Sequence, residues 1–141
     1  MNVVVLRGHL SSPPRGRQLP SGDRLGSFEV TVRRAGSATE TVPVVWLDPP
    51  EAVMGLGRGD EVVVVGRVRR RFYRGARGTG SRTEVVAERL LPAAWRSRVL
   101  GMLDMAIADI DVTDGAGWAG QAGVDQDGAD TVGNRMGTSN L

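Results

Sequence analysis

Residues 61–68 read Glu-Val-Val-Val-Val-Gly-Arg-Val, and residues 69–78 continue as Arg-Arg-Arg-Phe-Tyr-Arg-Gly-Ala-Arg-Gly. Four consecutive valines favour a β-strand, because β-branched side chains pack well on a pleated sheet. Gly66 interrupts the apolar run, and a glycine inside a strand often marks a bend or a bulge. We therefore expect a long strand that bends at Gly66 and continues directly into a basic segment.

The basic segment, residues 67–78, contains six arginines, two aromatic residues and no acid. Guanidinium groups neutralise phosphates, and an aromatic ring can stack on an unpaired base, so this composition is typical of a surface that binds single-stranded nucleic acid. A solvated loop without a ligand is the alternative, since most charged runs are simply solvated. All eighteen basic residues of the chain are arginine, so the clustering is more informative than the residue type.

An extended strand divides the basic segment between two faces, because successive side chains point to opposite sides. One face carries the predicted nucleic-acid stripe: Arg67, Arg69, Arg71 and Tyr73. The opposite face carries Val68, which we expect in the core, together with Arg70 and Phe72. Because Arg70 cannot be buried unpaired, the strand is expected to leave the core there and to become one arm of a projecting hairpin. Phe72 either packs against the loop or stacks on a base.

Further arginines are candidate phosphate contacts, with a solvated role as the open alternative for each. Arg74 and Arg77 lie in the glycine-rich tip of the predicted hairpin. The others lie outside it: Arg7, Arg15, Arg17, Arg33 and Arg34.

Four other segments have the alternation or the composition of β-strands: residues 3–10, 25–34, 39–47 and 82–90. A long loop is predicted after the first of them. A short helix is predicted from Asp48 to Met54, since aspartate can cap a helix and proline is tolerated in its first turn. Five strands with one helix between the third and the fourth are the order of an all-β OB-fold barrel, whose middle strands and loops bind oligonucleotides. We assign this domain to residues 1–92.

The chain changes character after Pro92. Apolar residues recur at helical spacing in residues 93–111, which predicts an amphipathic helix that caps the barrel, packs on another subunit or folds only with a partner. Residues 112–141 are rich in glycine and aspartate, which predicts a disordered tail with Trp118 as a candidate docking anchor. Residues 1–98 hold seventeen arginines and nine acids, whereas residues 99–141 hold one arginine and seven aspartates. A basic body therefore carries an acidic tail, which either competes for the basic surface, engages other proteins or only adds solubility.

Six short motifs follow one another along residues 3–92. They are Val5-Leu-Arg-Gly-His-Leu10, Leu19-Pro-Ser-Gly22 with Ser27-Phe-Glu-Val30, Thr39-Glu-Thr-Val-Pro-Val-Val45, Leu56-Gly-Arg-Gly-Asp-Glu-Val62, Val65-Gly-Arg-Val68 and Thr83-Glu-Val-Val86. Together they resemble the bacterial single-stranded-DNA-binding proteins. The resemblance implies an OB fold, sequence-tolerant binding of single-stranded DNA in replication, recombination or repair, a cytoplasmic and nucleoid-associated location, and assembly as a dimer or tetramer, often through the first strand.

The departures from that family also matter. Tyr73 falls where the family has a tryptophan at the end of the fourth strand, but Thr41 and Leu47 occupy third-strand positions that would carry rings. Each lost base stack removes about 1–3 kcal/mol of affinity, so binding is expected to be weaker and more electrostatic. The family recruits replication and repair proteins through an acidic tail ending in Pro-Phe, whereas residues 136–141 read Met-Gly-Thr-Ser-Asn-Leu. A divergent paralogue or an auxiliary protein is therefore expected.

The residue inventory favours binding over catalysis. The chain has no cysteine and one histidine, His9, and its acids show no metal-ligand spacing, so no enzyme, cofactor or metal is expected. No apolar run approaches the roughly 20 residues of a membrane span, which predicts a cytoplasmic protein. Single-stranded DNA is the leading partner. A binder of single-stranded RNA and an OB-fold assembly module with weak or no DNA binding are the alternatives, since nothing in the sequence reads the 2′-hydroxyl.

Overall fold

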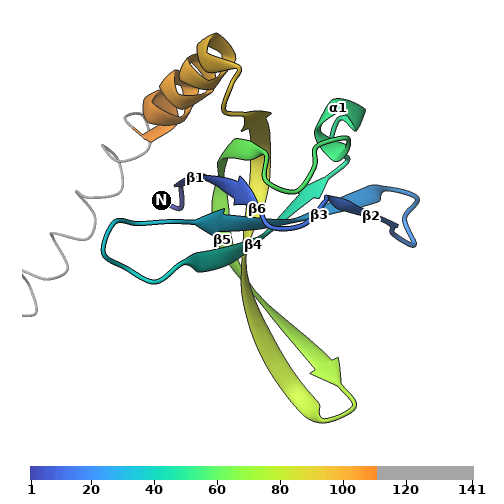
Figure 1. The fold of residues 1–141 in the computed structure, drawn as a ribbon. Helices are drawn as coiled ribbons and strands as arrows, with labels where there is room; N and C mark the ends of the chain where they lie inside the picture. Colours follow the sequence, from blue (N-terminus) through green and yellow to red (C-terminus); the bar gives the residue numbers. More distant parts are fainter. Residues whose placement is uncertain (111–141) are drawn as a thin grey trace, which may run out of the picture. The chain divides into compact units, whose positions relative to one another are not determined.

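The computed structural model describes residues 1–110, most of which form β-strands. The strands are β1 (Val4–Leu10), β2 (Arg15–Gln18), β3 (Arg24–Val32), β4 (Glu40–Leu47), β5 (Glu61–Gly75) and β6 (Gly78–Pro92). They form one sheet in the order β1-β5-β6-β4-β3-β2, and β1 also pairs with β3. The pairing therefore closes a ring, β1-β3-β4-β6-β5, with β2 added to the outside of β3 (Figure 1). The prediction of a mostly β, barrel-like domain is confirmed.

A short helix is also present, as α1 (Glu51–Met54) between β4 and β5. It starts three residues later than predicted, and its N-cap is Pro50 and not Asp48, whose carboxylate accepts the Arg24 N–H instead. Residues 2–106 form one compact unit, to which residue 1 and residues 107–110 do not belong. The predicted tail, including Trp118, lies outside the described residues. Among residues 1–110, no helix is long and apolar enough to cross a membrane.

The core inside the ring follows from the alternation of apolar and polar residues along the strands. On β3, Phe28 and Val30 are buried while Ser27 is exposed, as the pattern predicts. The ring's buried residues come from all five of its strands and from α1: Leu10, Phe28, Val30, Val44, Val53, Val62, Val64, Val85, Ala87 and Leu90. Trp46, on the same face of β4 as Val44, packs against this core but is only partly buried.

The loop predicted after β1 contains a strand of its own. In β2, Arg15 to Gln18 pair antiparallel with the start of β3 although all four residues are exposed. Backbone hydrogen bonds hold this strand, and nothing in its sequence alternates, which is why the pattern predicts a loop. The sequence prediction was wrong there, and the correction matters because β2 carries Arg15 and Arg17.

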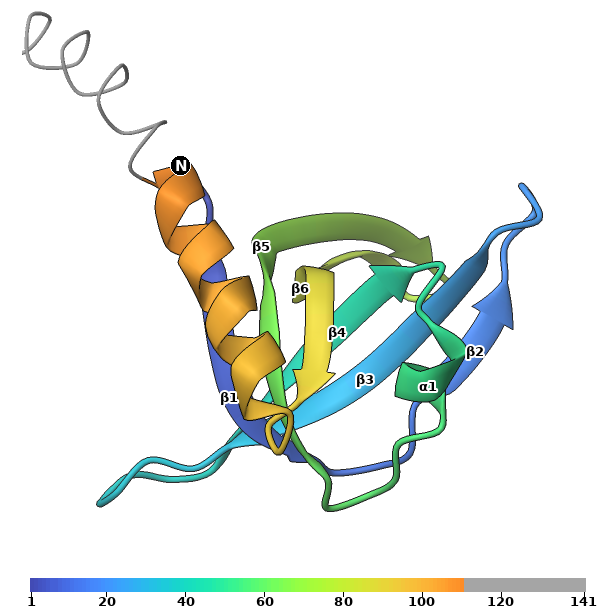
Figure 2. The ribbon, with the colours of Figure 1, turned by 90° about the horizontal axis from the view of Figure 1, so that it is seen from above.

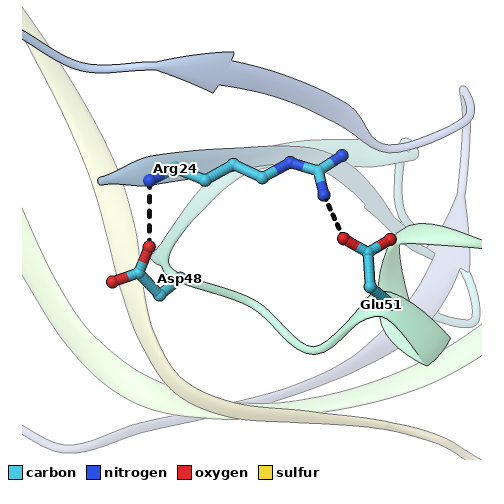
Figure 3. Close-up of polar contacts among 3 residues, drawn as sticks. All are labelled: Arg24, Asp48 and Glu51. Atoms are coloured by element: carbon cyan, nitrogen blue, oxygen red, sulfur yellow. Dashed lines mark hydrogen bonds and ion pairs between the residues drawn. The ribbon is translucent and has the colours of Figure 1, made fainter. Parts of the chain in front are cut away.

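Arg24, at the start of β3, ties this corner of the sheet together (Figure 3). Its backbone N–H donates to Asp48 Oδ1 at 2.9 Å, and the Asp48 N–H donates to its carbonyl at 2.7 Å. The guanidinium forms an ion pair with Glu51 of α1. The same side chain lies over Gly16 of β2, where an added Cβ would come within 2.7 Å of Arg24 Nε. Arg24 thus links β2, the end of β4 and α1.

β5 and β6 leave the ring together as a projecting hairpin (Figure 1). The register shifts between Val65 and Gly66, as the sequence predicts for a bend at this glycine. A Cβ on Gly66 would lie 2.1 Å from the Val86 carbonyl oxygen, so only glycine allows the two strands to approach here. The hairpin ends in a two-residue turn, Ala76 and Arg77.

Val68 corrects another prediction, because it is 42% exposed rather than buried in the core. The strand leaves the ring at the bulge, before Val68, and not at Arg70. The Asn2 side chain satisfies the backbone at this point, since its amide donates to the Val68 carbonyl at 2.7 Å and its oxygen accepts from the Val68 N–H at 2.8 Å.

A helix covers residues 96–110, starting later than the predicted residue 93. Val99, Met102 and Ala106 pack against Val63 and Val65, which form a second buried cluster on the outer face of β5. This explains the continuous valine run of β5: alternate valines face the ring core and the helix. Of the three roles considered for the helix, the structure shows that its residues 96–106 cover the barrel.

Candidate nucleic-acid interface

A groove of about 650 Å³ crosses the outer face of β3 and β4. Its floor includes Pro43 and Val45, and Val45 is buried although it points away from the core. β2 borders β3 on one side, as Figure 2 shows, and the base of the β5–β6 hairpin borders β4 on the other. The groove therefore exists because β2 and the hairpin flank the middle of the sheet.

Basic side chains enter this groove from both walls. Arg15 and Arg17 come from β2, and Arg71 and Arg82 come from the hairpin. Arg71 and Arg82 are directly opposite each other in the β5–β6 register, so their side chains share one face. Sequence analysis missed Arg82. Pairing the hairpin outward from its tight turn would have placed it beside Arg71.

Glu84 fixes the orientation of the stripe on β5. Arg69 Nη2 lies 2.7 Å from Glu84 Oε1, and Arg71 Nε lies 3.9 Å from the same oxygen. The Glu84 side chain is only 1% exposed, whereas Arg69 and Arg71 keep 42% and 46% of their side-chain surface exposed. A buried carboxylate needs such partners, because an unpaired buried charge is strongly destabilising. Glu84 thus anchors both guanidiniums on the side that faces the protein, and their other side is exposed to solvent.

The contacts divide the hairpin into the two faces expected from strand geometry. Arg69 and Arg71 share Glu84 on one face, whereas the Arg70 guanidinium stacks 5.5 Å from the centroid of the Phe72 ring on the other. Arg70 also donates to Ser81 Oγ at 3.1 Å. Phe72 is 74% exposed and contacts a cation rather than packing into a core. Only the face with Arg69 and Arg71 is continuous with the groove.

Tyr73 lies on the groove side, two residues beyond Arg71 along β5. Its ring lies against Gly80, where an added Cβ would be 2.7 Å from Tyr73 Cζ. Half of the residue remains exposed, so the ring rests on the backbone of β6 and offers its other face to solvent. Arg67 precedes Arg69 on the same face, and Arg74 and Arg77 are exposed toward the tip.

Three of the arginines predicted as contacts, Arg7, Arg33 and Arg34, lie outside both the groove and the hairpin. Arg33 lines a separate pocket together with His9 and Arg58. Arg34 is exposed in the turn after β3, where its carbonyl accepts from the Ser37 N–H at 3.1 Å. The groove and the hairpin therefore gather nine of the twelve predicted residues: Arg15, Arg17, Arg67, Arg69, Arg71, Phe72, Tyr73, Arg74 and Arg77.

Arg7 is engaged elsewhere in the fold. Its guanidinium donates to the Glu61 carboxylate across the β1–β5 pair. This hydrogen bond lowers the pKa of the Glu61 carboxyl below its ordinary value, because it stabilises the ionised form. Arg7 therefore serves the β1–β5 pair rather than the groove.

Nothing in the described part of the chain resembles a metal site, since residues 1–110 contain no group of three or more His, Cys, Asp or Glu side chains able to hold a metal ion. In comparisons with known proteins, no family model matches the chain and no curated protein matches it.

Proposed function

We propose that residues 1–92 are an OB fold that binds single-stranded DNA without sequence preference. The ring order β1-β3-β4-β6-β5 supports this fold assignment. So does the place of α1 between β4 and β5, which are the third and fourth ring strands along the sequence. In OB folds the face of the middle strands and the adjoining loops bind oligonucleotides. The groove lies on that face of the ring, between β2 and the long hairpin.

The observation that carries the proposal is the set of arginines that converge on one face. Arg15 and Arg17 stand on one wall, Arg71 and Arg82 on the other, and Arg69 shares Glu84 with Arg71. Guanidiniums spread along a groove suit a chain of phosphates, and anchored ones lose little side-chain entropy on binding.

Binding in this groove would be mainly electrostatic. Arginines hold the phosphates, and Tyr73 stacks on one base at the hairpin end of the path. No aromatic side chain lines the groove itself. On β4, the positions where rings would be expected are the exposed residues Thr41 and Leu47. With a single stacking platform, affinity is expected to fall steeply with salt, with a slope of about 0.7 per phosphate contacted.

The test is fluorescence anisotropy with a labelled oligothymidylate over a range of salt concentrations. Tyr73→Ala is expected to weaken binding about five- to tenfold, in line with the loss of one stack. Arg71→Ala is expected to weaken it and to reduce the salt slope by about 0.7. Phe72→Ala, on the opposite face of the same strand, controls for general damage to the hairpin and is expected to cost less than Tyr73→Ala.

The same titration with oligouridylate measures the preference between DNA and RNA. Absence of binding at low salt, or a Tyr73→Ala, Arg71→Ala double variant that binds as well as the unsubstituted chain, would exclude a nucleic-acid function for the groove. The interaction-module alternative would then be favoured.

A further inference from the structure

A second basic pocket, of about 280 Å³, lies where β1 meets β3 and the turn before β5. We call it the His9 pocket. His9 and Thr31 are directly opposite each other in the β1–β3 pair, and Arg33 follows β3. Arg58 and Gly59 belong to the turn, and Ser11 follows β1. Three separate segments thus bring two guanidiniums and an imidazole to one place.

Neither arginine of the pocket has an acidic partner among the described residues, in contrast to Arg71 and Arg82 of the groove. Arg7, Arg24, Arg69, Arg71 and Arg82 each form an ion pair. Within residues 1–110, neither Arg33 nor Arg58 forms an ion pair or a side-chain hydrogen bond. Their charges are available to a ligand.

Two acids beside the pocket, one following Gly59 and one opposite His9, already have partners. Asp60 Oδ2 accepts the Gly57 N–H at 2.8 Å, and Glu61, which stands opposite His9 in the β1–β5 pair, binds Arg7. The pocket therefore has an excess of donors.

The backbone holds the turn of the pocket against β1. The Gly59 N–H donates to the Leu10 carbonyl at 2.7 Å, and the Leu10 N–H donates to the Asp60 carbonyl at 3.0 Å. Gly59 has φ +91°, a backbone conformation that residues other than glycine rarely adopt. The backbone of the turn that carries Arg58 is thus fixed beside the strand that carries His9.

We infer that the His9 pocket binds a phosphate group. Guanidinium groups match the geometry of phosphate oxygens, and an imidazole can donate a further hydrogen bond. A phosphate is attracted more strongly to these guanidiniums than to an arginine that is already paired, because no carboxylate of the described residues neutralises Arg33 or Arg58.

The phosphate has two chemical sources, a nucleic-acid strand or a free phosphorylated molecule. Ser11 lines the pocket and Ser12 lines the groove, and Glu29 of the groove is two residues from Thr31 on the same face of β3. The pocket therefore adjoins the groove, and a strand that crosses the groove can place a phosphate in it. This first source rests on the proposed function, whereas the second does not.

The first experiment titrates the isotope-labelled full chain with inorganic phosphate and follows backbone amide shifts, with sodium chloride at equal ionic strength as the reference. Saturable shifts are expected at His9, Arg33, Arg58 and Gly59. They are expected to disappear in an Arg33→Gln, Arg58→Gln double variant and to persist in Arg96→Gln, which removes an exposed arginine of the helix. Shifts that persist in the double variant would overturn the inference.

The second experiment measures oligothymidylate binding by the same variants. If the phosphate belongs to a strand, the double variant binds about two- to fivefold more weakly and its salt slope falls by about 0.7; if the site takes free phosphate, oligonucleotide binding is unchanged. Localised phosphate shifts in a chain that binds no oligonucleotide would contradict only the proposed function. Oligonucleotide binding that is insensitive to the double substitution, combined with no phosphate shifts, would contradict only the phosphate site.

Discussion

Glu84 is the residue that sets the electrostatics of the groove. Its carboxylate lies buried beneath Arg69 and Arg71 and holds both guanidiniums on the groove side of the hairpin. It also cancels one positive charge in a surface that we propose binds a polyanion. Glu84 therefore has two opposing effects on the proposed binding: it orients Arg69 and Arg71, and it weakens the attraction of the groove for phosphate. A substitution of Glu84 can measure which effect is larger.

Glu84→Gln keeps the size of the side chain and removes its charge. We expect the free energy of unfolding to fall by about 1–3 kcal/mol, since a charged hydrogen-bonded pair is weakened in a buried position. We expect oligothymidylate affinity at low salt to rise, because the groove loses a negative charge. Urea denaturation and salt-dependent anisotropy measure the two effects.

Glu88→Gln is the matched control, because it makes the same change at an exposed residue that does not line the groove. If Glu84→Gln weakens oligonucleotide binding at every salt concentration, orientation of Arg69 and Arg71 matters more than charge.

The Arg7–Glu61 pair gives stability that depends on pH. The pKa of Glu61 is lowered in the folded state by the hydrogen bond from Arg7, so the pair stabilises the fold above the unfolded glutamate pKa of about 4.3. That stabilisation is lost as the pH falls through the folded pKa. Arg7→Ala is expected to lower the urea midpoint at pH 7 and to have a smaller effect at pH 3. In a Glu61→Gln background the pH dependence of the Arg7→Ala effect should vanish; its persistence would assign the effect to another group.

At the scale of elements, the bulge at Gly66 marks where a strand of the barrel becomes one arm of the projecting hairpin. Before the bulge, the valines of β5 are buried on both faces, and after it every residue up to Gly75 is exposed. The close approach of Gly66 to the Val86 carbonyl makes this exit possible.

Gly66→Ala is expected to lower the free energy of unfolding by about 2–4 kcal/mol, because both contacting groups belong to the backbone and neither can move aside cheaply. Gly101→Ala is the control. No atom lies within 4 Å of the added Cβ there, and replacing a helical glycine with alanine typically stabilises by about 1 kcal/mol. Equal effects of the two substitutions in thermal unfolding would contradict this account of the bulge.

The elements that the sequence predicts correctly are those whose own side chains report their burial. β1, β3 and β4 show β-branched composition or alternation, and their positions agree closely with the prediction. β2 and residues 78–81 of β6 are stabilised by backbone pairing while their side chains are mostly exposed, so no apolar pattern marks them. Val68 was predicted in the core because valine is typical of buried strand positions. Only the register shift between Val65 and Gly66 shows that β5 has already left the core at Val68.

At the scale of the molecule, residues 96–106 of the helix complete the burial of β5. Met102 is 4% exposed and packs with Val99 and Ala106 on Val63 and Val65. It does not line the groove. Stability and the proposed binding are therefore separable at this position.

Met102→Ala is expected to reduce the free energy of unfolding by about 2–5 kcal/mol, the usual cost of a large-to-small change in a core. Oligothymidylate affinity should be unchanged under conditions where the variant is folded. Met105→Ala, at a residue that is 56% exposed, should change stability much less. A loss of affinity in folded Met102→Ala would show that the helix and the groove are coupled.

The candidate site could be predicted only in part, because it is assembled by ring closure. The stripe of Arg67, Arg69 and Arg71 follows from the period of a single strand. Arg17 can be placed on the opposing wall of the groove only when β2 is known to pair with β3. Arg82 can be placed beside Arg71 only when the turn has fixed the register of the hairpin. Arg33, a candidate phosphate contact outside the hairpin, lies in the His9 pocket, since the direction in which β3 ends is a property of the sheet and not of its sequence.

The parallel pairing of β4 with β6 has a consequence for how the chain folds. The two strands are paired at only two positions, Val44 with Val85 and Val45 with Val86. Because these segments are far apart in the sequence, the chain must close a long loop before β4 and β6 can make contact. The β5–β6 hairpin needs only its two-residue turn, and hairpins form in about 1–10 μs. In stopped-flow measurements, Val44→Ala should therefore mainly accelerate unfolding rather than slow folding. The arm that carries the arginines would then be native-like before the barrel that it serves has closed.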